Sequence, residues 1–244
     1  MKNNTASRIH RVMTTWKSVQ STDSAISGWL RVFNVKSTDT TRDYVLVNHR
    51  LHLLIDEVAL LGDKLHLLSV SPGVYKPYLA KLDNALSPSI IHAKAQHVRQ
   101  YLTEDVYTGL AFSSELLPEE EEGISADDFR EIVDLVNQLE LMLQDSSFPS
   151  TLVVLIRRHI RMAELAIAEY PIRGAVAIKD AVKFAVGDLA FEAGALAPAG
   201  PQNADAVRRL WKKANDVADG AIKVDNLAQI GGRAMKLLSD LIGA

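Results

Sequence analysis

The chain has 244 residues, of which 48% are apolar and 23% are charged, a balance typical of a protein with a packed core. Its formal net charge of −3 gives no long-range attraction to nucleic acid or to an anionic membrane surface. Cysteine is absent, which excludes disulfide bonds, thiolate metal ligands and a cysteine nucleophile, and indicates an intracellular protein.

Two amphipathic helices are predicted at the beginning of the chain. Apolar residues recur at helical spacing from Ile9 to Val19, behind a cap at Thr5 or Ser7, and again over 25–33. The first twenty residues contain no apolar segment of the secretion-signal type. No window reaches the roughly 18 uninterrupted apolar residues of a membrane span. We therefore expect a soluble protein.

The most regular stretch is a long helix predicted from Tyr44 to Leu68. One row of apolar residues has strict 3–4 spacing: Tyr44, Val47, Leu51, Leu54, Val58, Leu61, Leu65 and Leu68. A second row repeats every seven residues: Leu46, Leu53, Leu60 and Leu67. One row is typical of a two-helix seam, whereas two rows predict a helix enclosed by several others.

The polar side of this helix carries the best candidate for a metal site. His49, His52 and Asp56 occupy positions i, i+3 and i+7, so their side chains point to one side. Imidazole and carboxylate groups at this spacing can share a divalent metal or a proton. The alternative is a solvated polar face with His–Asp pairs. The zinc-protease pattern of two histidines four apart with an adjacent glutamate is missing here.

Four helices and an acidic run are predicted between residues 71 and 143. The helices cover about 74–86, 88–101, 103–117 and 125–143. The run from Glu119 to Glu122 interrupts them, and a solvated loop is its simplest interpretation, with a partner-facing acidic patch as the alternative.

A helical hairpin is predicted next, with arms at 151–170 and 172–192 separated at Pro171. It carries the densest positive cluster of the chain: Arg157, Arg158, Arg161 and Arg173. These arginines are candidate contacts for an anion or a partner, because guanidinium groups pair with phosphate and carboxylate. Ordinary salt bridges to Glu164 and Glu169 are the alternative. His159 is interpreted as a buried, hydrogen-bonded histidine.

The last part of the chain follows a linker predicted at 193–202, which is rich in Ala, Gly and Pro. The tail at 203–244 has two apolar stripes, and its large residues are candidate contacts with a membrane or a partner: Leu210, Trp211, Leu238 and Leu241. The same stripes can equally pack on their own domain or on another copy of the chain.

These patterns together predict an all-α protein, a multi-helix bundle of stacked helical hairpins at 1–192 with a separate C-terminal helical tail at 203–244. Phosphate-binding glycine loops and nucleophile motifs are missing, so no cofactor is predicted. A large basic excess and exposed aromatic residues are also missing, so no nucleic-acid partner is predicted. The leading hypothesis is a non-enzymatic interaction or regulatory protein of the bacterial cytoplasm, which binds a protein partner or itself through helices. The alternatives are a membrane-recruited protein that uses the tail, and a metal-dependent enzyme that uses the long helix.

Overall fold

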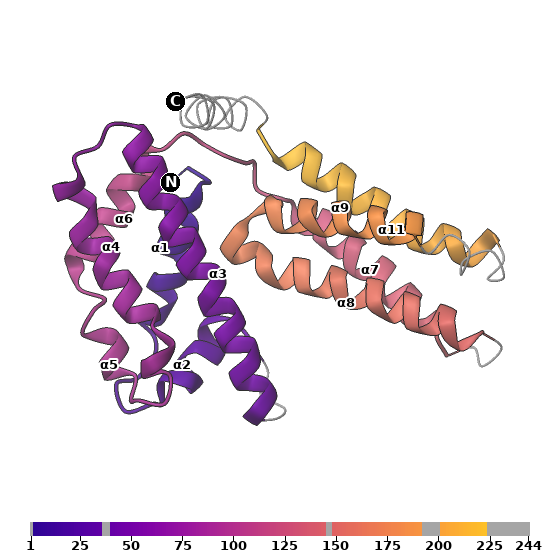
Figure 1. Cartoon of the computed structure of the whole chain (residues 1–244), viewed down its shortest axis with the longest axis horizontal. Helices are drawn as coiled ribbons and strands as arrows, with labels where there is room; N and C mark the ends of the chain where they lie inside the picture. Colours follow the sequence, from indigo (N-terminus) through magenta and orange to yellow (C-terminus); the bar gives the residue numbers. More distant parts are fainter. Residues whose placement is uncertain (1, 36–39, 145–147, 192–200, 224–244) are drawn as a thin grey trace, which may run out of the picture. The chain divides into compact units, whose positions relative to one another are not determined.

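The computed structural model describes residues 2–35, 40–144, 148–191 and 201–223 (Figure 1). Within these ranges the chain forms ten α-helices and no strand, which confirms the all-α prediction. None of these helices is both long and apolar enough to cross a bilayer.

Contacts between residues divide the chain into two compact units. Unit 1 comprises residues 1–120 and 171–173, and unit 2 comprises residues 121–170 and 174–244. This division differs from the sequence-based one, because the helix that begins at Pro201 packs with the helices of 126–191. The predicted linker at 193–202 lies outside the described residues up to residue 200.

Unit 1 contains six α-helices and a short 3₁₀ helix: α1 (Thr5–Trp16), α2 (Ala25–Val32), α3 (Thr40–Leu67), α4 (Pro72–Leu86), η1 (Pro88–Ile90), α5 (Gln96–Arg99) and α6 (Glu104–Leu116). The long helix α3 packs against α1, α2 and α4, while α6 packs against α1 and α4. Asn4 caps α1, since its side chain accepts the Ser7 N–H and its own N–H donates to the Ser7 hydroxyl.

Of the two predicted rows of α3, the first is buried along its middle, although Tyr44 at its beginning is only partly buried and Leu68 at its end is 43% exposed. Val47, Leu51, Leu54, Val58, Leu61 and Leu65 of the first row are buried. In the second row Leu53 is half-buried against the core, whereas Leu60 is 38% exposed. The prediction of an enclosed helix is therefore correct for one broad face of α3 and wrong for the edge that carries Leu60.

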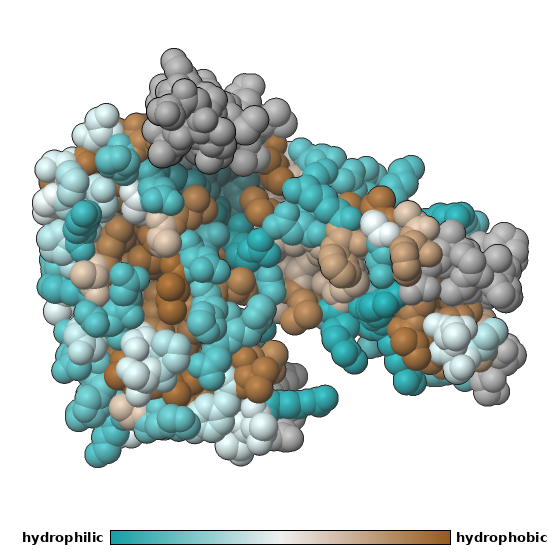
Figure 2. All heavy atoms as spheres, viewed as in Figure 1, coloured by the Kyte–Doolittle hydropathy of each residue, from teal (hydrophilic) through white to brown (hydrophobic). Residues whose placement is uncertain are grey.

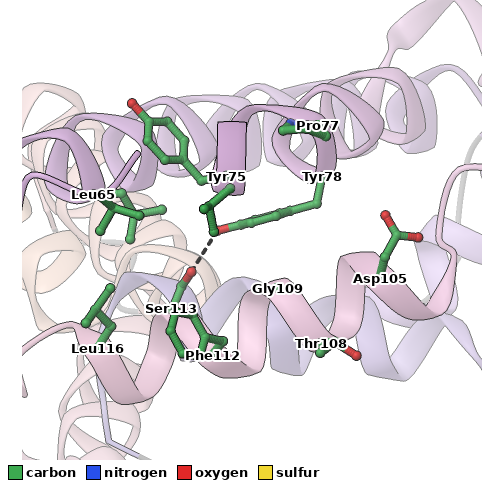
Figure 3. Close-up of a pocket in the computed structure, with 12 residues that line it drawn as sticks. Leu65, Tyr75, Pro77, Tyr78, Asp105, Thr108, Gly109, Phe112, Ser113 and Leu116 are labelled. Carbon is green, nitrogen blue, oxygen red and sulfur yellow. Dashed lines mark hydrogen bonds between the residues drawn. The ribbon is translucent and has the colours of Figure 1, made fainter. Parts of the chain in front are cut away.

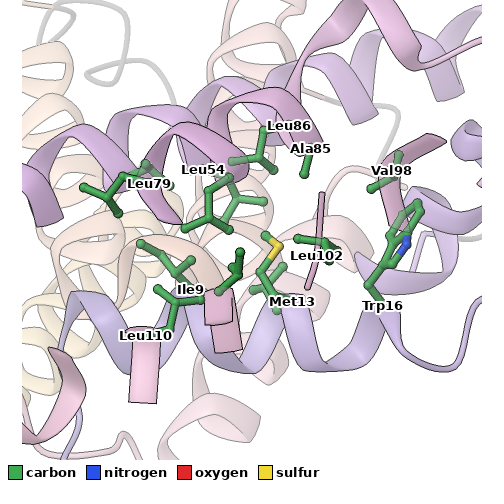
Figure 4. Packing of buried hydrophobic residues seen from close by; sticks show 14 of the residues in the cluster. Ile9, Met13, Trp16, Leu54, Leu79, Ala85, Leu86, Val98, Leu102 and Leu110 are labelled. Carbon is green, nitrogen blue, oxygen red and sulfur yellow. The ribbon is translucent and has the colours of Figure 1, made fainter. Parts of the chain in front are cut away.

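The core of unit 1 combines aliphatic side chains from α1, α3, α4 and α6 with two tryptophans. Figure 4 shows the part of this core that includes Trp16. The rings of Trp16 and Trp29 lie 4.3 Å apart between centroids. Gly28 makes this arrangement possible, because a Cβ there would lie 2.7 Å from the Trp16 ring.

The helix predicted over 88–101 is interrupted between η1 and α5. The Ala25 N–H donates to the Ala93 carbonyl and the Ala95 N–H donates to the Asp23 carbonyl, each at 2.8 Å. These backbone bonds to a distant segment replace the helical ones, which apolar spacing alone does not reveal.

Unit 2 is built from four helices: α7 (Ala126–Met142), α8 (Ser150–Arg173), α9 (Ala175–Phe191) and α11 (Pro201–Ala221). The last turn of α8 is counted with unit 1. The prediction that Pro171 ends the first hairpin arm is wrong, because α8 continues through it. Gly174 ends the helix instead, in the left-handed backbone conformation with φ +67°, which favours glycine.

The core of unit 2 lies along α11 and its neighbours. Val207, Leu210 and Trp211 of α11 are buried among apolar residues of the other three helices, including Leu139, Leu155 and Ile178. The first apolar stripe of the predicted tail is thus part of this core.

Candidate functional site

Unit 1 has a groove between α4 and α6, of about 320 Å³, which we call the α4–α6 groove (Figure 3). It is lined by Leu65, Val70, Val74, Tyr75, Pro77, Tyr78, Asp105, Thr108, Gly109, Phe112, Ser113 and Leu116. Figure 2 shows apolar residues reaching the surface of this unit between hydrophilic ones.

The floor of the groove depends on a glycine in α6. A Cβ at position 109 would lie 2.6 Å from the Tyr78 ring, so Gly109 allows this ring to lie directly against the α6 backbone. The Tyr78 hydroxyl is 2.7 Å from the Ser113 hydroxyl, and this bond satisfies both groups (Figure 3). Burial raises the pKa of Tyr78, so its hydroxyl stays neutral.

The rim of the groove is apolar and exposed. Phe112 is 58% exposed, Val74 is 56% exposed and Leu116 is 41% exposed. All three side chains line one hollow, and exposed large apolar residues gathered in this way mark surfaces that bind a partner or a ligand.

One end of the groove carries an ion pair. The Asp105 carboxylate accepts hydrogen bonds from Lys81 Nζ at 2.8 and 3.0 Å. The bonds from Lys81 and Thr103 hold the pKa of Asp105 below its usual range. Helix α6 contains no Lys or Arg, while it carries Glu104, Asp105 and Glu115. Among the polar lining residues, the Ser113 and Tyr78 hydroxyls bond each other and Asp105 is held by Lys81.

A second feature of unit 1 is a buried cluster of charges. The Arg8 guanidinium lies 3.1 Å from the Glu57 carboxylate and 3.3 Å from that of Glu120. Lys64 Nζ donates to Glu120 at 2.8 Å and to the Thr5 hydroxyl at 2.7 Å. Two cations and two carboxylates thus balance each other where α1, α3 and the segment after α6 meet.

The two carboxylates of this cluster differ in their affinity for protons. Burial raises the pKa of Glu57 in spite of the neighbouring Arg8 charge. Burial also acts to raise the pKa of Glu120, but the charges of Lys64 and Arg8 outweigh it and hold this pKa below its usual range. Both side chains are at most 15% exposed, so the cluster is structural rather than a site that a substrate reaches.

The acidic run Glu119–Glu122 is not the solvated loop that its composition predicts. Glu120 belongs to the charged cluster of unit 1. The Glu121 carboxylate is buried in unit 2, where it accepts the Ala175 N–H at 2.5 Å and lies against Gly174. A carboxylate at the N-terminus of α9 is favourable, because free N–H groups and the positive end of the helix dipole are there. Sequence reasoning missed both roles, since their partners are remote in the chain.

The proposed metal ligands on α3 face solvent. His49, His52 and Asp56 are all exposed. Among the described residues no group of three His, Asp or Glu side chains could hold a metal ion. The structure therefore offers no support for the metal-dependent alternative.

The arginine cluster does not form a uniformly positive surface. Its members are Arg157, Arg158 and Arg161 in unit 2, and Arg173 in the segment counted with unit 1. Arg158 pairs with Asp188 at 2.9 Å. Arg157 and Arg161 line a polar hollow of about 380 Å³ together with Glu140 and Glu164, whose charges offset theirs.

The structure describes two of the four candidate contact residues of the predicted tail. Leu210 and Trp211 are at most 3% exposed and belong to the core of unit 2, so neither is available at its surface. Leu238 and Leu241 lie outside the described residues. His159 is completely buried and hydrogen-bonded to Trp211, which agrees with its interpretation as a structural histidine.

Comparisons with family models, curated proteins and solved structures gave no match, so no family or function follows from similarity.

Proposed function

We propose that this chain is a non-enzymatic interaction protein, and that the α4–α6 groove of unit 1 binds an amphipathic helix of a protein partner. The observation that carries the proposal is the apolar groove with Phe112, Val74 and Leu116 exposed along its rim. A location in the cytoplasm, which the absence of cysteine favours, is part of the same proposal.

The shape of the groove fits a helix of limited length. Its lining residues on α6 are Asp105, Thr108, Gly109, Phe112, Ser113 and Leu116, which repeat at the spacing of one helix face. The eleven steps from Asp105 to Leu116, at 1.5 Å each, correspond to roughly 16 Å, or about three helical turns. A partner helix would therefore offer apolar anchors at positions i, i+3 or i+4, and i+7.

The charged groups at the beginning of α6 already have partners within unit 1. Asp105 pairs with Lys81 at 2.8 Å, and Glu104 pairs with Lys17 at 3.5 Å. We therefore expect the groove to recognise its partner mainly through apolar contacts, with charge contributing to the orientation of the partner.

Phe112 is expected to contribute most to binding. A phenylalanine buries roughly 150–250 Å² in total. Because Phe112 is 58% exposed, docking would cover roughly 100 Å² more of it. At about 25 cal/mol per Å² this amounts to about 2.5 kcal/mol, or about 70-fold in Kd.

The test compares exposed apolar residues inside and outside the groove. F112D and V74D change the rim, and F184D and V45D are matched controls, because Phe184 is 65% exposed and Val45 is 64% exposed elsewhere on the chain. Proteins that copurify with the wild-type chain from its native cells are identified and expressed. Their affinities for all five chains are then measured by calorimetry.

The expected result is a partner whose Kd rises about 50-fold or more with F112D. V74D should weaken the same partner, while the controls and the thermal unfolding of all variants stay near the wild type. The proposal fails if no copurifying protein binds directly, or if groove and control variants weaken binding equally.

A further inference from the structure

The buried histidine of unit 2 has an unusual set of neighbours. His159 of α8 has no exposed surface. The indole Nε1–H of Trp211, on α11, donates to His159 Nδ1 at 3.0 Å, and the two rings meet edge to face with centroids 5.9 Å apart. A side chain of α8 is thereby hydrogen-bonded to the largest side chain of α11.

The Trp211 bond fixes where the histidine carries its proton. An indole nitrogen can only donate, so His159 Nδ1 must accept and the neutral ring carries its proton on Nε2. His159 Nε2 lies 3.3 Å from Asp188 Oδ2 of α9, but neither atom has a hydrogen bond of good geometry within the described residues. The same Asp188 oxygen lies 2.9 Å from Arg158, which already balances its charge.

Protonation would remove the bond between the two helices. A charged imidazole has N–H donors at both nitrogens, so the new Nδ1–H would face the Trp211 N–H across 3.0 Å. Two donors cannot bond each other, and Trp211 would have to move. Because the Trp211 side chain is 3% exposed, it cannot move without disturbing the packing of α11.

The charged groups around the His159 ring shift its pKa in opposite directions. Burial lowers the pKa of His159, the Asp188 carboxylate raises it, and the Arg158 guanidinium lowers it further. Asp188 comes from α9 and Arg158 from α8, while α11 provides the neutral indole. Within the described residues no charged group of α7 or α11 is among the causes of this shift.

We propose that the His159–Trp211 pair is a proton-sensitive latch, which holds α11 on the other helices of unit 2 at neutral pH and releases it when His159 takes up a proton. Release would expose the apolar stripe of α11, including Val207 and Leu210, which the core now covers.

The direction of the pH dependence follows from linkage. A histidine whose pKa is lower in the folded than in the unfolded state contributes stability that is complete above the unfolded pKa of about 6.5. This contribution is lost as the pH falls through the lowered native pKa. The latch is therefore closed at pH 7.5 and weakens in mildly acidic solution.

The experiment measures hydrogen exchange of α11 amides in the full chain at pH 7.5 and 5.0, corrected for the intrinsic rate. In the wild type the protection of α11 should fall about tenfold or more, while α7 and α8 keep most of theirs. H159N places an amide oxygen near the Nδ1 position and cannot titrate, so protection should not change with pH. H10N is the matched control, since His10 of unit 1 also has a pKa lowered by burial, and it should behave as the wild type.

A second measurement uses the wild type alone, so the test does not depend on how well H159N folds. The NMR signal of the Trp211 indole N–H, assigned with W211F, should shift with the same midpoint as the His159 ring nitrogens. The proposal is overturned if α11 protection is constant between the two pH values, if H159N loses it as the wild type does, or if all helices of unit 2 lose it together. Independent titration of the indole and the ring would overturn it as well.

Discussion

Replacing Glu120 by glutamine tests whether the buried charges hold unit 1 together. In the wild type the Glu120 carboxylate accepts hydrogen bonds from Lys64 Nζ at 2.8 Å and from the Thr5 N–H at 3.1 Å, and it pairs with Arg8 at 3.3 Å. Glutamine has nearly the same shape, but one oxygen becomes an NH₂ group. In E120Q this donor would face other donors, and two buried cations would share one carboxylate.

The magnitude follows from the number of interactions that are lost. A hydrogen bond to a charged group contributes roughly 1.5–3 kcal/mol, and breaking a buried ion pair by removing one partner costs about 3–5 kcal/mol. Since glutamine keeps one acceptor oxygen, we expect E120Q to lower the free energy of unfolding of unit 1 by about 3 kcal/mol.

The control for this prediction lies two residues away. Glu122 is exposed and its carboxylate is 3.7 Å from Lys223, so E122Q should change stability by less than about 0.5 kcal/mol. Unfolding by urea is followed by tryptophan fluorescence in a W211F background, where only Trp16 and Trp29 of unit 1 emit. With an m-value near 2 kcal/mol per M, a loss of 3 kcal/mol lowers the midpoint by about 1.5 M.

The pH dependence of the stability of unit 1 provides a second, independent test. Because the native pKa of Glu120 is lowered, its contribution is present above the unfolded pKa and is lost as the pH falls through the native one. The difference between the wild type and E120Q should therefore shrink in acid. Equal urea midpoints for E120Q and E122Q at neutral pH would refute the assignment of Glu120 to a stabilising cluster.

Two further predictions concern neighbouring features. Burial raises the pKa of Glu57, so the contribution of Glu57 to stability is complete below the unfolded pKa of about 4.5 and is lost as the pH rises through the native pKa. The stability of E57Q relative to the wild type should therefore increase as the pH rises through this range, which is opposite to E120Q. Urea titrations at several pH values check the sign. G174A combines a positive φ with a Cβ that overlaps the Glu121 carboxylate, so it should destabilise unit 2 by about 2–4 kcal/mol. In α9 an added Cβ at Gly187 would meet no other atom, so G187A should be neutral or stabilising by up to about 1 kcal/mol. Equal melting temperatures of the two glycine variants would contradict this account.

The helices themselves could be predicted because their signals are local. The 3–4 spacing of Val47, Leu51 and Leu54 defines the buried face of α3 without reference to any other segment. Helix ends were less predictable where backbone conformation decides them. Proline is the residue expected to break a helix, yet α8 continues through Pro171. Gly174 ends α8, because its positive φ of +67° turns the chain out of the helix.

The buried polar groups could not be predicted, because their partners are far away in sequence. Glu120 and Glu122 stand in the same acidic run, but Glu120 is held by Arg8 and Lys64 while the Glu122 side chain is 70% exposed. A run of like charges usually stays in water, and composition gives no indication of which member has buried cations opposite it.

The α4–α6 groove could not be predicted from the sequence for a different reason, and the same reason supports a role in binding. Helix α6 has more apolar residues than its own core uses: Val106 and Leu110 are completely buried, whereas Phe112 and Leu116 lie on the rim. The spacing of apolar residues does not distinguish the buried pair from the pair on the rim, so the sequence predicts only a well-buried helix. Only the structure distinguishes the two pairs: the Tyr78 ring lies against α6 at Gly109, and the Phe112 and Leu116 side chains line the groove beside it. Fold stability alone does not require a large exposed apolar residue at position 112, and a partner that covers this residue would explain its presence.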